Sequence, residues 1–177
     1  GVNISNASGS EIVGNNISGN TNQINFATNT VNTDVAIYSN ILHDGFGTST
    51  GINNNIGANA FKFGGAGNLS NEIYNVTNGI TAGLTNSVTS GSIIGNVIHD
   101  TTSVGIKLDN ASNLSVTGNV IYSGVKGIEL TTGSNNLFSQ NAIYAMSTAN
   151  IDNIGASGLA TTPVVTSAAI SAGNIQV

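Results

Sequence analysis

Residues 92–144 repeat one phrase three times, as Gly95-Asn96-Val97-Ile98-His99, Gly118-Asn119-Val120-Ile121-Tyr122 and Gln140-Asn141-Ala142-Ile143-Tyr144. A second phrase, Gly105-Ile106-Lys107-Leu108, stands between the first two copies and returns as Gly127-Ile128-Glu129-Leu130 between the second and third. Two phrases that recur at a nearly constant offset mark an internal repeat of about 22 to 25 residues. The chain is therefore a repeat protein in which each repeat forms one structural unit.

The same frame extends toward both ends of the chain. The marker Asn recurs at intervals of 25, 31, 25, 23 and 22 residues, and two positions after each marker stands Ile or Leu. An apolar residue also stands three positions before every marker except the third, where Asn68 interrupts the pattern. The markers are Asn15, Asn40, Asn71, Asn96, Asn119 and Asn141.

The longest interval, 31 residues, follows the second marker. We interpret residues 45–59 as an insertion, after which Ala60-Phe61-Lys62-Phe63 matches the Gly-Ile-Lys-Leu phrase. A repeat protein accommodates insertions as flanking loops, which often carry a binding function. The alternative is a loop without a binding function, rich in Gly, Asn and Thr.

The pattern within each repeat predicts an all-β fold. Apolar residues alternate with polar ones in short runs, as at Leu114 and Val116, and Gly, Asn, Ser and Thr separate these runs. Three short strands and three turns in about 22 to 25 residues describe one coil of a parallel β-helix. We expect about six to seven coils over residues 1–154, and an irregular segment at 155–177 that caps the last coil or pairs with a partner.

The marker Asn suits such a coil for two reasons. Asn tolerates the left-handed backbone conformation that a sharp turn requires. Stacked Asn amides on successive coils can also hydrogen-bond to one another along the stack. We therefore predict a structural Asn ladder at the six marker positions.

The phrase (Gly/Ser/Gln)-Asn-x-Ile-(His/Tyr), followed by Gly-Ile-x-Leu, resembles the repeats of the right-handed parallel β-helix family, the pectin-lyase-like superfamily. The resemblance covers about residues 3–154 and implies a single-stranded, right-handed β-solenoid. Lyases, hydrolases, epimerases, adhesins and phage spikes share this fold, so the resemblance leaves the function open.

Composition narrows the classes of partner. The 177 residues include eight acidic side chains, three Lys and no Arg, for a formal net charge of -5. Cationic side chains must neutralise phosphates, so nucleic acid and anionic membrane surfaces are poor partners. No apolar run reaches the length of a membrane span, and Cys is absent, which excludes disulfides and thiolate chemistry.

One row of side chains is a candidate binding surface. The position after the Ile or Leu of each phrase holds Ser18 in the first repeat and an aromatic or imidazole ring in the others. Such a row could bind sugar rings or a partner surface. The alternative is cross-strand stacking that only stabilises the sheet. The ring residues are His43, Tyr74, His99, Tyr122 and Tyr144.

Catalytic residues are not predicted. The resemblance implies that β-helix lyases use a cationic base beside a uronate, and here Arg is absent and the Lys residues are isolated. Lys107 and Glu129 are expected to form an exposed ion pair worth under about 1 kcal/mol, in an outward row with Asn25, Lys62 and Thr81. A hydrolase needs paired carboxylates, and Asp100 and Asp109 form the only nearby pair in the regular block.

No cofactor or metal site is predicted either. One coil separates His43-Asp44 from His99-Asp100, which places them about 9 to 10 Å apart, too far for one metal ion. Oxygen ligands leave Ca²⁺ as an alternative at Asp44, Asp100, Asp109 or Asp152. Seven Asn-x-Ser/Thr sites permit glycosylation, namely Asn3, Asn6, Asn16, Asn68, Asn75, Asn110 and Asn113.

These observations favour a noncatalytic structural or adhesive β-solenoid at the cell surface or outside the cell. It would self-associate end to end in a filament, or form a module of a larger surface assembly. The competing hypothesis is a carbohydrate-active or sugar-binding β-helix domain whose partner is a polysaccharide. Neither hypothesis includes binding to nucleic acid or insertion into a membrane.

Overall fold

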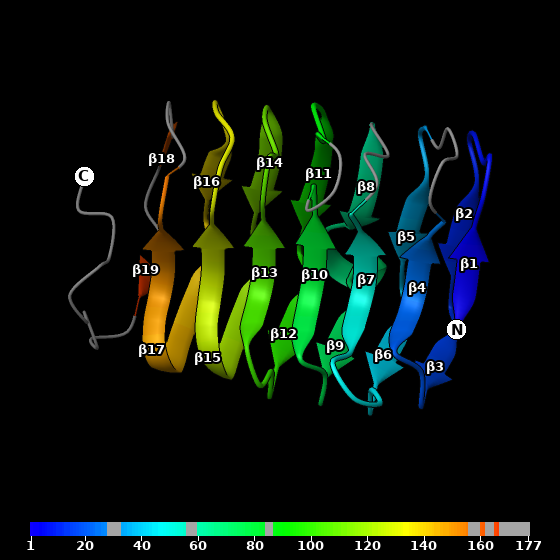
Figure 1. Cartoon of the computed structure of the whole chain (residues 1–177), viewed down its shortest axis with the longest axis horizontal. Helices are drawn as coiled ribbons and strands as arrows, with labels where there is room; N and C mark the ends of the chain where they lie inside the picture. The colour runs from blue at the N-terminus through cyan, green and yellow to red at the C-terminus, as the bar shows by residue number, and fades with distance from the viewer. Residues whose placement is uncertain (28–32, 56–59, 84–86, 156–159, 162–164, 167–177) are drawn as a thin grey trace.

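The structure, a computed structural model, describes residues 1–27, 33–55, 60–83, 87–155, 160–161 and 165–166. The chain winds through successive coils, and each coil adds strands to parallel stacks that run along the molecule (Figure 1). The only helix in the described residues is a single 3-10 turn, η1 (Gly67–Leu69). The prediction of an all-β parallel solenoid of about six coils is confirmed.

Three stacks of strands make up the wall of the solenoid. The first stack contains β2 (Glu11–Val13), β5 (Ala36–Tyr38), β8 (Phe61–Gly64), β11 (Gly91–Ile94), β14 (Leu114–Thr117), β16 (Leu137–Ser139) and β18 (Ala160–Thr161). The second contains β3 (Asn16–Ser18), β6 (Ile41–His43), β9 (Glu72–Tyr74), β12 (Val97–His99) and β19 (Val165–Thr166). The third contains β1 (Val2–Ile4), β4 (Asn22–Phe26), β7 (Thr50–Asn54), β10 (Asn78–Ala82) and β13 (Val104–Leu108). Two longer strands, β15 (Val120–Leu130) and β17 (Ala142–Asn153), run through both the second and third stacks.

Like residues face one another along each stack. In the second stack Ile98 pairs with Ile73 on one side and Ile121 on the other, and in the third stack Ile80 pairs with Ile52 and Ile106. All six side chains are completely buried. The period-two alternation therefore places one apolar row of each stack in a common core, and this burial is the main favourable contribution to folding.

The Asn ladder is present at the corner between the first and second stacks. Each marker from Asn15 to Asn119 donates its backbone N–H and its side-chain Nδ2 to Oδ1 of the marker one coil further on, as Asn96 does to Asn119 at 3.0 Å for both bonds. Asn96 Nδ2 also donates to the Phe63 carbonyl at 2.9 Å. The five markers from Asn40 to Asn141 are buried.

The reason given for Asn at this corner is corrected in one respect. The left-handed residue is the one before the marker: φ is +64° at Gly95, +65° at Gly118 and +55° at Gln140, whereas the markers themselves have no positive φ. Ser70, before Asn71, keeps an extended backbone instead. Asn is therefore needed here for its two-sided hydrogen bonding, not for its tolerance of the turn.

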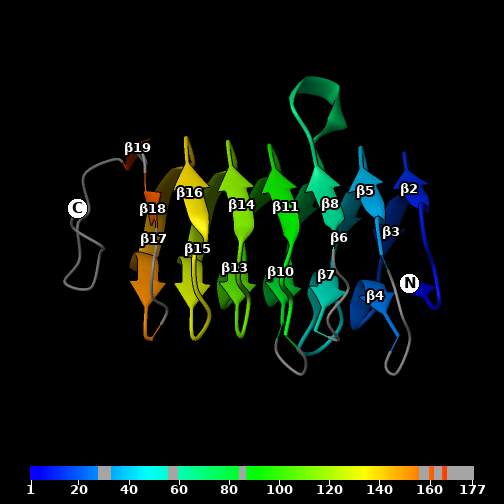
Figure 2. The ribbon, with the colours of Figure 1, turned by 90° about the horizontal axis from the view of Figure 1, so that it is seen from above.

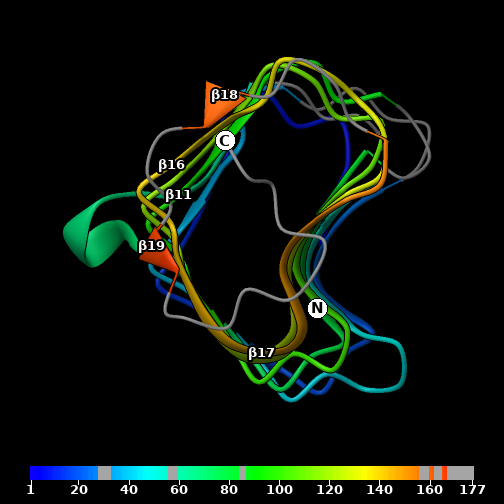
Figure 3. The same cartoon turned by 90° about the vertical axis from the view of Figure 1, so that its left-hand side faces the viewer.

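Glycine recurs where the third stack bends inward, and Figure 3 shows this concave side in the view along the coils. A Cβ on Gly79 would lie 2.6 Å from Ile98 Cγ2 and 2.4 Å from the Gly105 carbonyl oxygen. The backbone thus packs directly against the isoleucines of the second stack, and only glycine fits. We call this row, Gly51, Gly79, Gly105 and Gly127, the glycine bend.

The interpretation of residues 45–59 as an insertion is wrong. Residues 50–54 form β7, a regular strand of the third stack in register with β4 and β10, while residues 56–59 lie outside the described part. Gly51-Ile52 is thus the counterpart of the Gly-Ile phrase. Phe61-Lys62-Phe63 belongs instead to the first stack, where Phe63 pairs with Ile37 and Ile93.

Much of the long interval therefore lies just before the third marker. Phe63 and Asn71 are eight positions apart, whereas Ile93 and Asn96 are three apart. The extra residues form a loop around η1 that projects from the side of the solenoid (Figure 2). Phe63 therefore fills the apolar position that Asn68 had seemed to interrupt.

Within the segment expected to be irregular, β18 pairs with β16 and β19 pairs with β17. The rest of that segment beyond Gly155 lies outside the described residues. Among the described residues no helix has the length and apolar character needed to cross a membrane.

Candidate functional site

The predicted row of rings forms one continuous stack on the outer side of the second stack of strands. Ring centroids are 5.0 Å apart for His43 and Tyr74, 5.0 Å for Tyr74 and His99, 4.8 Å for His99 and Tyr122, and 5.3 Å for Tyr122 and Tyr144. The planes of neighbouring rings differ by 4° to 9°. We call these five residues the aromatic ladder.

This geometry limits what the aromatic ladder can bind. A sugar ring packs on the face of an aromatic ring, but both faces of Tyr74, His99 and Tyr122 are covered by their neighbours in the ladder. Their edges remain accessible, and they offer little apolar area. The arrangement fits cross-strand stacking that stabilises the sheet better than it fits a sugar platform.

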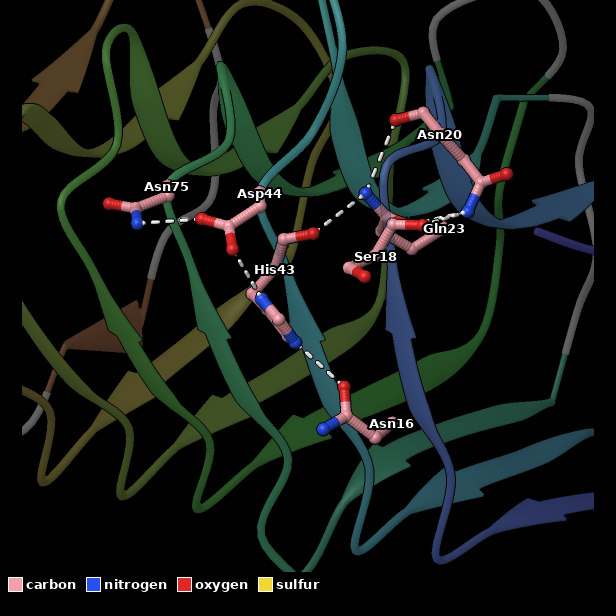
Figure 4. A network of polar contacts seen from close by, with 7 residues as sticks. All are labelled: Asn16, Ser18, Asn20, Gln23, His43, Asp44 and Asn75. Atoms are coloured by element: carbon pink, nitrogen blue, oxygen red, sulfur yellow. Dashed lines mark hydrogen bonds and ion pairs between the residues drawn. The ribbon is translucent and has the colours of Figure 1, made fainter.

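His43 lies at one end of the ladder in a network of polar contacts (Figure 4). Its Nδ1 is 2.8 Å from Asp44 Oδ2, and its Nε2 is 2.7 Å from Asn16 Oδ1. Ser18 pairs with His43 on the neighbouring coil, so a Ser, a His and an Asp come together. Nucleophilic catalysis would need Nε2 to bond the serine hydroxyl, and here Nε2 contacts Asn16 instead.

His99 repeats the pattern two coils further on. Its Nδ1 is 2.8 Å from Asp100 Oδ2 and its Nε2 is 3.5 Å from Glu72 Oε1. Between the two pairs, Asn75 donates to Asp44 at 2.8 Å, and this bond, followed by the one to His43, holds the pKa of Asp44 below its ordinary value. In the described residues no group of three or more His, Cys, Asp or Glu side chains could hold a metal ion.

A second outward row runs along the concave side of the third stack, and here the contacts change along the chain. At the N-terminal end Asn25 donates to Asn3 at 2.9 Å, Asn53 donates to Asn25 at 2.8 Å and Thr81 donates to Asn53 at 2.9 Å. Beyond Thr81 the row becomes charged. We call the whole set the concave row, namely Asn3, Asn25, Asn53, Thr81, Lys107, Glu129 and Asp152.

The charged part is a four-residue ionic cluster formed by Lys107, Lys126, Glu129 and Asp152. Lys107 Nζ lies 2.9 Å from Glu129 Oε1, and Lys126 Nζ lies 2.5 Å from Glu129 Oε2 and 2.7 Å from Asp152 Oδ2. The Glu129 side chain is only 8% exposed, so the contact expected to be an exposed pair is largely shielded from water. Each lysine therefore has at least one carboxylate partner.

The ionic cluster shifts the pKa values of two of its members, Glu129 and Lys126. Burial raises the pKa of Glu129, but hydrogen bonds from Lys126 and Lys107 outweigh it, so the pKa is lower than its ordinary value. Hydrogen bonds to Asp152 and then Glu129 raise the pKa of Lys126. Glu129 is thus a poor proton donor and Lys126 a poor base near neutral pH, because catalytic groups need a pKa near the working pH.

Sequence reasoning predicted the Lys107–Glu129 pair but missed Lys126 and Asp152, and it assigned one position of the outward row incorrectly. Lys62 is not in the row; Asn53 holds the equivalent place, and Lys62 lies 3.7 Å from Asp34 elsewhere. Lys126 was not considered, although it stands three positions before Glu129. That spacing carries a signal only once the chain is known to bend at Gly127, which brings residues 126 and 129 to the same side.

The carboxylate pair singled out in the sequence does not form. Asp100 and Asp109 flank β13, a five-residue strand, so they stand at opposite ends of it, and Asp109 accepts instead from Thr132 at 2.8 Å. The carboxylates on facing positions of neighbouring coils are Glu129 and Asp152. The asparagines of all seven glycosylation sequons are exposed, namely Asn3, Asn6, Asn16, Asn68, Asn75, Asn110 and Asn113.

Taken together, the parallel stacks, the buried Asn ladder and the repeated outer rows define a β-solenoid of the β-helix class. A family model described as the right handed beta helix region matches residues 47–167. The chain belongs to this right-handed β-helix family, consistent with the pectin-lyase-like resemblance of its repeats. Searches of curated proteins and of solved structures gave no match.

Proposed function

We propose that this protein is a noncatalytic structural or adhesive β-solenoid that acts at the cell surface or outside the cell. The observation that carries the proposal is the ionic cluster, the one place where two lysines and two carboxylates meet. Its opposite charges neutralise one another, and these contacts keep Lys126 protonated and Glu129 ionised. This pairing favours a role in holding coils together over one in proton transfer.

The two histidines support the same proposal. Each uses both ring nitrogens in contacts with neighbouring side chains and stacks on the aromatic ladder. The outward polar groups of these coils thus contact mainly other outward groups of adjacent coils. Such an arrangement suits a rod whose task is to keep its shape and to present a surface.

Self-association is the second part of the proposal. Among the described residues β1 and β3 end the longer sheet and β2 ends the other, and each pairs with a single strand. A further coil, from the same polypeptide or from another copy, could continue all three stacks there. Open strand edges are templates for such addition.

Electron microscopy across a concentration series, with light scattering in parallel, tests the proposal. Rods that lengthen with concentration would support end-to-end assembly, and rods of constant length would support a module of a larger surface protein. In the same preparation, a panel of acidic and neutral polysaccharides tests catalysis. New reducing ends or unsaturated uronates would refute the noncatalytic proposal if Glu129→Gln or Asp152→Asn abolished them.

The second candidate is a sugar-binding domain that uses the concave row instead of the aromatic ladder. The favouring observation is that its first three coils present only uncharged amide and hydroxyl groups, beside a depression of about 260 Å³ lined by Gly1, Val2, Asn3, Asn22 and Asn25. Such groups would suit neutral sugars. Binding to a neutral polysaccharide that Asn25→Asp weakens and Tyr74→Leu leaves unchanged would favour this candidate.

A further inference from the structure

The ionic cluster joins three successive coils at the glycine bend. Lys107 lies on β13, Lys126 and Glu129 on β15, and Asp152 on β17, so Glu129 faces Lys107 from one neighbouring coil while Lys126 reaches the other. The backbone here has no side chain at Gly127, where a Cβ would lie 2.4 Å from Ile143 Cγ2. The cluster therefore lies where the backbone packs directly against the isoleucine row.

We propose that the ionic cluster is an acid-sensitive brace, which ties β13 to the second half of β15 near neutral pH and releases this joint when Glu129 is protonated. The inference is independent of whether the rod assembles end to end. It concerns the joint between the fourth and fifth coils, counted by the marker Asn, and not the solenoid as a whole.

The rest of the concave row supplies the contrast. From Asn3 to Thr81, which lies in the third coil, the contacts are amide and hydroxyl hydrogen bonds, which do not titrate in the acid range. The Asn ladder at the opposite corner is equally neutral. Acid therefore changes the cross-coil contacts at the C-terminal end of the row and leaves those at the N-terminal end unchanged.

The direction of the pH effect follows from the two shifted groups. The pKa of Glu129 is lower in the folded chain than its ordinary value of 4.5, so its stabilising contribution is complete above that value and disappears as the pH falls through the folded pKa. The pKa of Lys126 is raised above 10.5, so its contribution is complete below that value and is lost at higher pH. The brace is intact between these limits and opens on either side.

The contacts of Glu129 make the braced joint responsive to this loss. Protonated Glu129 would leave two lysines facing a neutral group in a site that is largely shielded from water. Among the described residues Lys107 would then have no other carboxylate partner, whereas Lys126 would keep its contact with Asp152. The loss therefore falls on the contact between β13 and β15.

Hydrogen exchange measured by mass spectrometry tests the brace. Protection factors, corrected for the intrinsic rate, would be compared at about pH 7 and about pH 3, on either side of ordinary carboxyl pKa values. We expect peptides from β13 and the second half of β15 to lose at least about tenfold in protection at low pH, and peptides from β4 and β7 to lose less than about twofold. An equal loss in all four strands would overturn the proposal.

Variants separate the brace from a general effect of acid. Glu129→Gln should reduce protection of the β13–β15 joint at neutral pH and remove most of its further loss in acid. Lys62→Gln, which removes an ion pair on the first stack, is the matched control and should leave the joint unchanged. If Glu129→Gln does not fold, Lys107→Gln replaces it, because Lys107 joins Glu129 to β13 and helps to lower the pKa of Glu129. A folded Lys107→Gln variant whose joint keeps the neutral protection and the full acid loss of the wild type would refute the brace.

Discussion

The Asn ladder and the concave row run along the same coils, yet they are built in opposite ways. The ladder repeats one neutral contact between identical, buried side chains from coil to coil. The concave row passes from amides through a threonine to a charged cluster. A buried row allows few residue types, because each buried polar group must be paired by a hydrogen bond. A row at the surface allows several residue types, because water can pair with groups that have no protein partner.

The largest effect is expected from breaking the Asn ladder at its centre. Asn96→Ala leaves Asn71 Nδ2 and the Phe63 carbonyl without their partners at 2.9 Å, in a completely buried position. Because unpaired buried groups each cost about 1 to 3 kcal/mol, we expect the free energy of unfolding to fall by about 3 kcal/mol or more. Urea denaturation followed by circular dichroism measures this change.

Asn15→Ala is the matched control, since Asn15 is exposed and ends the described ladder. It should lower the free energy of unfolding by about 1 kcal/mol or less, because water can replace the lost bonds. Equal losses in the two variants would mean that burial does not set the strength of the ladder.

A somewhat smaller effect is expected at the glycine bend. Gly105→Ala places a Cβ 2.6 Å from Ile121 Cγ2 and 2.7 Å from the Gly127 carbonyl, and overpacking of this kind costs about 1 to 3 kcal/mol. Ile121→Leu removes the clashing methyl group, so the double variant should recover part of the loss in urea denaturation. If the double variant is less stable than the sum of the single losses predicts, the isoleucine methyl is not the obstacle.

The sequence predicted the Asn ladder and the aromatic ladder because both depend on one residue type returning at one position in each repeat. The glycine bend was visible as part of the Gly-Ile phrase, but its reason was not, because the contact with Ile98 or Ile121 comes from a different strand of the next coil. The position of β7 was missed because Asn53 and Asn54 replace the Lys and Leu of the phrase. The segment around Lys62 matches the phrase better but belongs to the first stack.

At the ionic cluster the comparison can be tested through pH. Glu129→Gln replaces charged hydrogen bonds, each worth about 1.5 to 3 kcal/mol, with neutral ones, so we expect a loss of about 2 kcal/mol at neutral pH. The loss should begin to shrink as the pH falls below 4.5 and should approach zero below the lower pKa of the folded chain, where the wild-type carboxyl is also protonated. Urea denaturation of both proteins from about pH 7 to about pH 3 measures it. A difference that stays constant with pH would contradict the assignment.

Only the Lys107–Glu129 pair of the cluster could be predicted, for a physical reason. Lys126 stands three positions before Glu129, on the other side of the bend at Gly127, and Asp152 stands 23 positions after Glu129. Only the folded register brings Asp152 opposite Glu129. Register here depends on turns of unequal length, which a repeat period describes only on average. Outward residues also carry no apolar signal, so nothing in the pattern distinguished Lys126 from a solvated lysine.

The smallest effect on the free energy of unfolding is expected in the aromatic ladder. A variant there distinguishes a stabilising role of the ladder from a binding role. Tyr122→Leu keeps an apolar side chain but removes the stacking contacts with His99 and Tyr144, at 4.8 and 5.3 Å. Because an aromatic pair is worth about 0.5 to 1.5 kcal/mol beyond its buried area, we expect a loss of about 1 kcal/mol in urea denaturation. Binding to any polysaccharide should not change, because neighbouring rings cover the faces of Tyr122. Weaker binding at unchanged stability would assign the ladder to recognition, and the concave row would then lose its place as the preferred sugar surface.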